Sequence, residues 1–334
     1  MLAGDPAQLA PLGGTPLWVE ASSSTSNNEA LGKCLYSTFN TVFFLTKNYR
    51  QGSAHARDLA TFLSNYRNGA LTNEDWRWFE SRSREHVSEL DFTAASESAI
   101  HLFPTNEKVR EYNIQKLQQI SVQDLVSVSI FPAKNSCAKA AAASNKLAGG
   151  LDKVVSLCLG ASVMITQNLW TEQGIVNGAS GRVVDFIKDG DGCVAIVVDV
   201  PKYRGPPLCG AAIERRTWIP IRRQEATWYT GRKGQTCKRE QFPLTLSFAV
   251  TIHKSQGSSF AVPVVVDIGK ADQTCGSTYV AMSRCTASDQ IFHNGYARDR
   301  IKKNFASPAF ICRMKEEKRL LRLHNLRIHV PANQ

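Results

Sequence analysis

The hydrophobic pattern of the 334-residue chain changes twice, and these changes limit the folds that it can adopt. Residues 100–103 form a short apolar run, and a Pro-Thr-Asn turn at 104–106 then opens a helical pattern. The apolar positions of that pattern fall on one helical face at Val109, Tyr112, Leu117 and Ile120. A strand followed by a capped amphipathic helix predicts an α/β domain with a parallel sheet.

A different pattern runs from about residue 150 to residue 243. Asn177-Gly178 and Asp189-Gly190 mark turns there between short runs that favour strands. These strand candidates lie at 161–166, 181–187, 193–200 and 213–219. Short strands separated by turns predict a small β barrel or sandwich. The α/β pattern returns at 244–251 and 262–268, so the β domain is predicted to be inserted into the α/β domain.

Further elements are predicted on either side of the insertion. The predicted strands are 41–45 and 290–293, and the predicted helices are 54–68 and 277–285. A basic helix is predicted to begin at Pro308, with Ser307 as its N-cap. The Ala-rich segment 133–150 is interpreted as an insertion or linker, with a short Ala helix as the alternative.

The excess of positive charge is concentrated in two places. The chain holds 40 Lys and Arg against 29 Asp and Glu, a net charge of +11. Residues 201–250 carry 10 basic and 3 acidic side chains, and residues 301–334 carry 8 and 2. Such blocks favour a polyanionic partner, most commonly nucleic acid, although a solvated basic face is the simpler alternative.

The nine cysteines contain no CxxC pair, so their spacing favours neither a zinc site nor a disulfide framework. Reduced thiols in an intracellular protein fit this pattern better. The sequence has no run of about 18 apolar residues that would span a membrane. The N-terminal residues show no signal peptide, so we expect a protein that is not secreted.

Three motifs carry the chemistry: GDPAQLAP at 4–11, TIHKSQGSS at 251–259 and YVAMSRC at 279–285. Two weaker blocks stand between the first and second motifs, FFLTKNYRQ at 43–51 and LFPTNEKVREYN at 102–113. In this order the blocks resemble the motor core of superfamily 1 helicases of the RecD/Pif type. The segment 160–186 resembles the small inserted β domain of the Pif group, and the resemblance covers most of residues 2–295.

The resemblance implies an α/β fold: a RecA-like, P-loop NTPase-type parallel sheet domain with an inserted SH3-like β barrel. Residues 1–37 are then a remnant of a first RecA-like motor domain. Residues 38–130 and 244–306 form the second RecA-like domain, and 150–243 the inserted β domain. Residues 307–334 form a basic C-terminal helix or tail.

The same resemblance implies the nucleotide-handling residues. Gln8 is expected to sense the γ-phosphate, since a neutral amide can bind a phosphate and release it cheaply. Arg50 and Arg284 occupy the positions of the two arginine fingers, although a structural ion pair is the alternative for each. The residues that we expect to act in catalysis are Gln8, Arg50 and Arg284. Those expected at the cofactor are Gly4, Asp5, Gln8, Gln256, Gly257 and Arg284.

Binding of a DNA strand without sequence preference needs basic groups and stacking surfaces. Residues 202–239 interleave ten Lys and Arg with four aromatic residues, and these aromatics could instead be barrel core. Asn106 is expected to contact the DNA backbone or, equally simply, to cap a helix; a packed His253 is an equal alternative to an orienting one. The predicted DNA contacts are Asn106, Thr251, His253, Lys254, Ser255, Arg222, Arg223 and Trp228.

The sequence contains no G-x-x-x-x-G-K-[ST] loop, and only three residues precede Gly4, where the family's acidic Mg²⁺-binding pair would stand. We therefore expect the C-terminal portion of an ATP-dependent 5′-to-3′ DNA helicase, inactive alone, whose complete form uses ATP and Mg²⁺. No metal ligands are predicted within the chain. The alternatives are a non-catalytic single-strand-binding remnant and an RNA helicase of the Upf or viral superfamily 1 type.

The expected partners are single-stranded DNA, duplex junctions and ATP, with no membrane, and the expected state is a monomer. The expected compartment is the nucleus or mitochondrion of a eukaryote, or otherwise the cytoplasm. Such a helicase would act in DNA repair and recombination.

Overall fold

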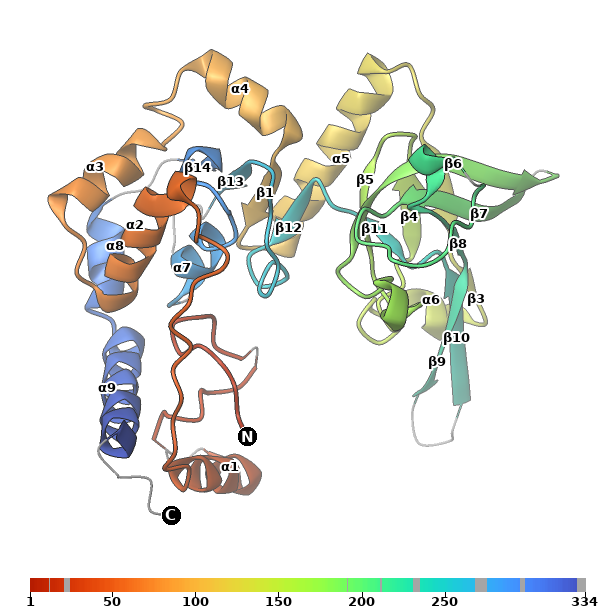
Figure 1. Ribbon diagram of the computed structural model, residues 1–334. Coiled ribbons are helices and arrows are strands. Elements are labelled where there is room, and N and C mark those ends of the chain that lie inside the picture. The colour runs from red at the N-terminus through yellow and green to blue at the C-terminus, as the bar shows by residue number, and fades with distance from the viewer. Residues whose placement is uncertain are drawn as a thin grey trace. The chain divides into compact units, whose positions relative to one another are not determined.

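The computed structural model describes residues 1–11, 13–20, 25–190, 192–210, 212–230, 235–267, 275–294 and 298–328. The chain divides into two compact units (Figure 1). Unit 1 comprises Met1–Asn106 and Val250–Gln334, and unit 2 comprises Glu107–Ala249. The finer boundaries that the resemblance implies, including an inserted domain at 150–243, stay predictions.

Unit 1 is built around a four-stranded sheet in the order β12-β1-β13-β14. Its strands are β12 (Ala249–Thr251), β1 (Ile100–Phe103), β13 (Val264–Val266) and β14 (Ile291–His293). β13 is parallel to both β1 and β14, with Val265 opposite His101 and Phe292. The three valines of β13 are buried, as expected for a central parallel strand covered on both faces. The predicted parallel α/β sheet is therefore confirmed.

The helices of unit 1 follow local sequence signals. α2 (Arg57–Asn68) buries Leu59, Phe62, Leu63 and Tyr66, one face of a 3.6-residue period. It ends where Gly69 adopts a φ of 67°, a left-handed conformation that costs glycine little. α3 (Asn73–Ser81) begins with a capping box in which Thr72 and Asp75 exchange side chain-to-backbone hydrogen bonds.

The remaining helices of unit 1 come from both ends of the chain. The N-cap predicted at Ser307 is confirmed, because the Phe310 N–H donates to Ser307 Oγ over 3.2 Å. The predicted helix at 277–285 is confirmed over its first six residues. These helices are α1 (Asn27–Ser37), α4 (Glu89–Ser98), α7 (Ser277–Met282), α8 (Arg298–Phe305) and α9 (Pro308–Ile328).

The strand predicted at 41–45 is wrong. These residues form no strand, and Phe43 and Leu45 are 67% and 100% exposed. A strand needs a neighbour to pair with its backbone groups, and none of the described sheets includes this segment. The strand predicted at 244–251 is divided in two, because β11 (Leu244–Leu246) pairs in unit 2 and β12 pairs in unit 1.

Unit 2 is mainly β structure. Its five-stranded sheet has the order β11-β5-β6-β7-β8, and the ladders of this sheet are antiparallel. The other strands form a three-stranded sheet, β3-β10-β9, and the pair β2-β4. Besides β11, the strands are β5 (Ser162–Ile165), β6 (Ser180–Asp189), β7 (Gly192–Asp199), β8 (Trp218–Arg222), β3 (Lys134–Asn135), β10 (Gln235–Gln241), β9 (Gln224–Thr230), β2 (Ser129–Pro132) and β4 (Val154–Leu157).

The core of unit 2 joins these strands to one long helix. α5 (Asn106–Gln123) contributes Leu117, with Tyr112 and Ile120 packed beside it, so the predicted apolar face is confirmed at three of its four positions, Val109 being the exception. The Ala-rich segment does contain the short helix, α6 (Ala138–Ala142). Of the strand predicted at 213–219 only the end is right, because Ile213–Arg215 is a 3₁₀ turn and β8 begins at Trp218.

Within the described residues, no helix combines the length and apolar character that crossing a membrane requires.

His293 provides a pH-dependent element of the unit 1 core. Its Nε2 donates to the Phe79 carbonyl oxygen over 2.8 Å, and its ring stacks on that of Phe79 at 4.1 Å. Burial, with a smaller contribution from the nearby Arg82 and His86, lowers the pKa of His293 to about 4. The folded chain therefore holds the neutral imidazole, whereas the unfolded chain binds a proton below about pH 6.5.

We expect this difference to destabilise the chain as the pH falls from 6.5 towards 4. The free energy of unfolding should fall by about 1.4 kcal/mol for each pH unit in that window through this one group. Urea unfolding measured from pH 7 to pH 4 gives the free energy of unfolding at each pH. His293→Gln should reduce the slope of this free energy against pH, while the exposed His55→Gln should keep the wild-type slope. Equal slopes for His293→Gln and wild type would contradict this account.

Candidate functional site

The GDPAQLAP segment forms a compact turn at Asp5. The Gln8 N–H donates to the Asp5 carbonyl oxygen over 3.1 Å, and the Ala7 N–H donates to Asp5 Oδ1 over 3.0 Å. This turn lies against the first residues of α7. A Cβ atom on Gly276 would stand 2.9 Å from Ala7 O, and Gly276 has a φ of 93°, so glycine is required at this contact.

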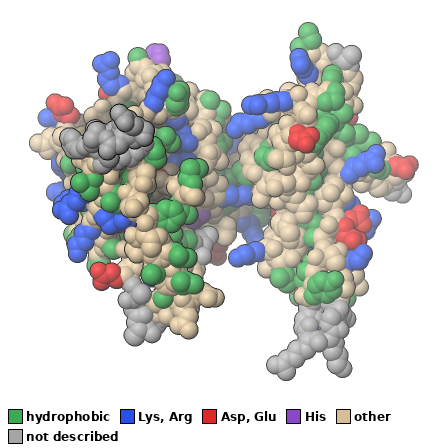
Figure 2. Space-filling model, turned by 60° about the horizontal axis from the view of Figure 1, so that its bottom comes forward, with side chains coloured by type: hydrophobic (Ala, Val, Ile, Leu, Met, Phe, Trp, Pro, Cys, Tyr) green, Lys and Arg blue, Asp and Glu red, His purple; other side chains and the backbone are tan. Residues whose placement is uncertain are grey.

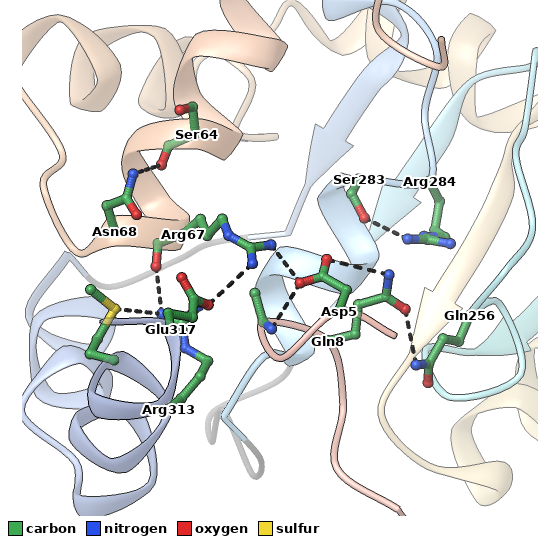
Figure 3. A network of polar contacts seen from close by, with 12 residues as sticks. Asp5, Gln8, Ser64, Arg67, Asn68, Gln256, Ser283, Arg284, Arg313 and Glu317 are labelled. Atoms are coloured by element: carbon green, nitrogen blue, oxygen red, sulfur yellow. Dashed lines mark hydrogen bonds and ion pairs between the residues drawn. The ribbon is translucent and has the colours of Figure 1, made fainter. Parts of the chain in front are cut away.

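A chain of hydrogen bonds connects this turn to the TIHKSQGSS loop (Figure 3). Gln256 Nε2 donates to Gln8 Oε1 over 3.0 Å, and Gln8 Nε2 lies 3.5 Å from Asp5 Oδ2. Residues that stand 248 positions apart in the sequence therefore share one contact. Gln8, Asp5 and Gln256, all predicted at the cofactor, are brought together.

Arg67 extends this network to the C-terminal helix and was missed from the sequence. Its guanidinium lies 2.5 Å from Asp5 Oδ1 and 3.2 Å from Glu317 Oε1, and Arg313 in turn contacts Glu317 over 2.9 Å. Burial alone would lower the pKa of Arg67, but Asp5 and Glu317 raise it above its usual value. In the sequence, Arg67 is one more basic residue in the last turn of a helix, and that signal points to no partner.

The two predicted arginine fingers lie beside α7. Arg50 donates from Nε to Ser259 Oγ over 2.6 Å and from Nη1 to the Ser283 carbonyl oxygen over 3.2 Å. Arg284 is almost fully buried and donates to the carbonyl oxygens of Val280 and Ser258 over 2.9 and 3.1 Å. A further bond, over 2.7 Å, goes to Ser283 Oγ.

These hydrogen bonds of Arg50 and Arg284 all go to neutral oxygen atoms. Burial lowers the pKa of Arg50, and burial together with the neighbouring Arg50 lowers the pKa of Arg284 to about 10. A buried cation without a hydrogen-bonded carboxylate is unfavourable, and an anion at this place would compensate it. None of these hydrogen bonds is the structural ion pair of the alternative, and the two groups fit a phosphate.

Gln51 joins the FFLTKNYRQ segment to the YVAMSRC segment, and the sequence analysis did not predict this role. It is buried beside Arg50, and its Nε2 donates to the carbonyl oxygens of Ser283 and Cys285 over 3.2 and 2.7 Å. The sequence gives no signal for this role, because a Gln after an Arg is equally typical of an exposed turn.

The TIHKSQGSS loop follows β12 at one edge of the sheet. The Ile252 N–H donates to Phe103 O over 2.9 Å, so this loop starts beside the end of β1, where the exposed Asn106 follows. Gly257 has a φ of 85°, in the left-handed region. Lys254 and Gln256 are exposed, and Thr251 and His253 are partly buried.

Ser255 departs from its predicted role as a DNA contact. Its side chain is 1% exposed and donates to the Ile252 carbonyl oxygen over 2.8 Å, so it holds the loop together. Thr251 acts locally as well, because its Oγ1 accepts a hydrogen bond from the Lys254 N–H over 3.2 Å.

Trp228 in unit 2 also contradicts its prediction as a stacking residue. It is 8% exposed and packs with Ala140, Ala148 and Cys237 in a small core cluster. Because side chains alternate along β9, the next residue, Tyr229, points the other way and is 77% exposed. The sequence shows both aromatic residues, but only the register of β9 decides which of them is accessible.

The basic residues of unit 2 also divide into two kinds. Arg222 is exposed at the end of β8. Arg223 lies over the Phe242 ring at 4.6 Å and donates to the Pro132 carbonyl oxygen over 3.1 Å, so it is partly structural. The interleaved Arg232 and Lys233 lie outside the described residues. Figure 2 shows Lys and Arg side chains spread over the face that it draws, with a few acidic side chains among them.

In the part of the chain that the structure describes, no three or more His, Cys, Asp or Glu side chains are grouped so as to hold a metal ion.

No protein-family model matches the chain. Its sequence is 30% identical to human ATP-dependent DNA helicase PIF1 over 248 residues, which are 72% of this chain and 33% of that protein. It is 29% identical to Pif1 of Bdellovibrio bacteriovorus over 222 residues, 66% of this chain and 43% of that protein. The chain is therefore similar to Pif1 helicases over most of its own length. It spans less than half the length of either of these relatives.

Solved Pif1 structures show the same fold. The crystal structure of Pif1 from Candida albicans matches with a TM-score of 0.57 and 24% identity, over 78% of this chain and 58% of that one. Bacteroides Pif1 bound to single-stranded DNA matches with a TM-score of 0.58 and 22% identity, over 89% and 62%. The RecA-like α/β fold predicted from the motifs is therefore confirmed.

The burial of Trp228 and the exposure of Tyr229 give opposite expectations for stability. Trp228→Ala removes a packed ring and should lower the free energy of unfolding by about 3–5 kcal/mol. Tyr229→Ala changes a surface side chain and should change it by less than about 0.5 kcal/mol. Chemical unfolding of the two variants measures the difference, and a larger loss for Tyr229→Ala would show that the register of β9 is wrong.

Proposed function

We propose that this chain is the C-terminal portion of the motor of an ATP-dependent DNA helicase that moves 5′-to-3′ along single-stranded DNA. The observation that carries the proposal is the pair of guanidinium groups of Arg50, which is partly buried, and Arg284, which is almost fully buried, bonded to neutral oxygens beside the Gln8–Gln256 contact. Homology to Pif1 supports it, since the human relative is named an ATP-dependent DNA helicase.

ATP is the proposed cofactor, and Mg²⁺ its counter-ion in the complete enzyme. Arg50 and Arg284 would hold the terminal phosphate, whose negative charge they would compensate, and the Gln8 amide would donate a hydrogen bond to that phosphate and lose it when the phosphate leaves. Gln8 bonds to Gln256, so a change in the contact of Gln8 with phosphate would alter its contact with the TIHKSQGSS loop. That loop then connects nucleotide and DNA.

The proposed DNA contacts differ between the two units. In unit 1, Lys254 and Asn106 are exposed at the sheet edge and suit contacts with backbone phosphates. In unit 2, Tyr229 offers a stacking surface and Arg222 a charge. We further propose binding at duplex junctions as a monomer, and action in the nucleus or mitochondrion of a eukaryote or otherwise in the cytoplasm.

A chimera tests the motor function. The N-terminal part of Bdellovibrio Pif1, up to the residues that match GDPAQLAP, is joined to this chain at Gly4. We expect DNA-stimulated ATP hydrolysis by the chimera and none by the chain alone, which lacks the P-loop motif. Arg50→Ala, Arg284→Ala and Arg284→Lys should each lower the hydrolysis rate by about 10³–10⁵.

The exposed Arg57→Ala in α2 is the matched control and should keep the rate. A folded chimera that binds DNA but hydrolyses no ATP would favour the passive binding protein. Hydrolysis by the chain alone would contradict the expectation that it is incomplete.

DNA binding by the chain itself gives a second test. Tyr229→Ala should weaken binding of single-stranded DNA by about 1–3 kcal/mol without changing its salt dependence, because stacking releases no counter-ions. Arg222→Gln should reduce the slope of log K against log salt by about 0.7. Fluorescence anisotropy measures both, and the exposed apolar Ile213→Ala serves as control. If both variants bound single-stranded DNA as the wild type does, the proposed DNA contacts of unit 2 would be wrong.

A further inference from the structure

Two cysteine side chains of unit 2 face each other across a strand pair. Asn135 lies opposite Arg239 and Lys134 opposite Glu240 in the ladder of β3 and β10. The same register, continued beyond β3, places Cys137 opposite Cys237. Their sulfur atoms are 3.5 Å apart, although 100 positions separate the two residues in the sequence.

The hydrogen bonds around this pair favour close approach of the two side chains. The Ser136 N–H donates to Lys238 O over 3.0 Å, and the Lys238 N–H donates to Ser136 Oγ over 2.9 Å. Position 136 is therefore the hydrogen-bonded site, and the alternation of an antiparallel ladder makes 137 a non-hydrogen-bonded one. At such sites the two Cα atoms are about 4.5 Å apart, within the range that a disulfide spans.

The surroundings make the two thiols unequal. Cys237 is fully buried among Ala140, Ala148 and Trp228, whereas Cys137 is partly exposed. A backbone hydrogen bond from Ala140, followed by the bond to Cys237, lowers the pKa of the Cys137 thiol. Burial instead raises the pKa of Cys158, Cys193, Cys209 and Cys285. Cys137 is thus the accessible member of the pair, and its lowered thiol pKa favours the thiolate that attack on a disulfide requires.

The segment that carries Cys137 is already held against β10. Arg239, which is fully buried, donates to the carbonyl oxygens of Leu151, Ala140 and Ala143 over 3.0, 2.7 and 3.0 Å. It also donates to Asn135 Oδ1 over 3.1 Å. Because these bonds fix the backbone on both sides of Cys137, the sulfur atoms can close to bonding distance by a side-chain movement of about 1.5 Å.

We propose that Cys137 and Cys237 form a thiol–disulfide exchange site, at which a small-molecule disulfide converts the two thiols into a cross-strand disulfide. The Cys137 thiolate attacks one sulfur of the small disulfide, which releases one small thiol and leaves a mixed disulfide on Cys137. Cys237 then gives up its proton and attacks Cys137 Sγ, which releases the second small thiol. The cysteine pair loses two electrons, and the small disulfide gains them.

The consequence falls on unit 2. The new bond closes a loop from residue 137 to residue 237, which contains most of the unit, and such closure restricts the unfolded chain. It also fixes the Ala-rich segment to the hairpin of β9 and β10, which carries the exposed Tyr229. The site does not depend on the proposed helicase function.

The test uses the full chain and glutathione disulfide as the probe. The reduced chain is incubated at pH 7 with increasing ratios of glutathione disulfide to glutathione, trapped by alkylation and digested without reduction. We expect a Cys137–Cys237 linked peptide to form before the exposed Cys34 is modified, and thermal unfolding of unit 2 to shift upward by several degrees. Urea should abolish the preference of the pair over Cys34.

Three variants separate the steps. Cys237→Ser should stop at glutathione bound to Cys137, Cys137→Ser should leave Cys237 unmodified, and the matched control Cys34→Ser should form the linked peptide as wild type does. Cys237→Ala replaces the first variant if the buried serine perturbs the fold, which circular dichroism reports. A folded chain whose pair stays reduced while Cys34 reacts, or a Cys237→Ser variant with unmodified Cys137, would overturn the proposal.

Discussion

The ion pair between Arg67 and Asp5 holds unit 1 together at the point where its three parts of the chain meet. Arg67 belongs to α2, Asp5 to the N-terminal turn, and Glu317, the second carboxylate, to α9. The side chains of Arg67, Asp5 and Glu317 are only 27%, 24% and 16% exposed, so solvent screens these charges less than it would at the surface. The positive charge of Arg67, which belongs to α2, therefore holds the turn that carries Gln8.

Arg50 and Arg284 show the opposite arrangement a short way along the same unit. Arg67 finds two carboxylates within the chain, whereas the hydrogen bonds of the other two guanidinium groups end on carbonyl and hydroxyl oxygens. Arg67 is therefore neutralised within the unit, whereas these hydrogen bonds give Arg50 and Arg284 no carboxylate partner. The contrast alone does not identify a phosphate ligand, because the fully buried Arg239 also donates to neutral oxygens and is structural. The positions of Arg50 and Arg284 in the motifs are needed as well.

The agreement between sequence and structure depends on the range of the interaction concerned. Helix α2, the cap at Ser307 and the apolar face of α5 follow from neighbours within a few residues, and all three were predicted. The segment 41–45 has the composition of a strand, but no strand among the described residues pairs with it. Trp228 and Tyr229 are adjacent aromatic residues, and only the pairing of β9 with β10 decides which is buried. The sequence predicts that the Ser255 hydroxyl binds DNA, whereas in the structure it donates to the Ile252 carbonyl oxygen.

The sequence by itself determined the order of the motifs, the two patterns of secondary structure and the residues that can meet a phosphate, because these depend on residue type and short spacing. Tertiary structure alone decided that Gln8 contacts Gln256, that Arg67 binds Asp5 and that Cys137 faces Cys237. Each of these contacts joins residues dozens to hundreds of positions apart. The register of β3 and β10 brings Cys137 to Cys237, and partial burial pairs the charge of Arg67 with Asp5. Short sequence patterns do not contain this information, because it depends on segments that are far apart in the chain.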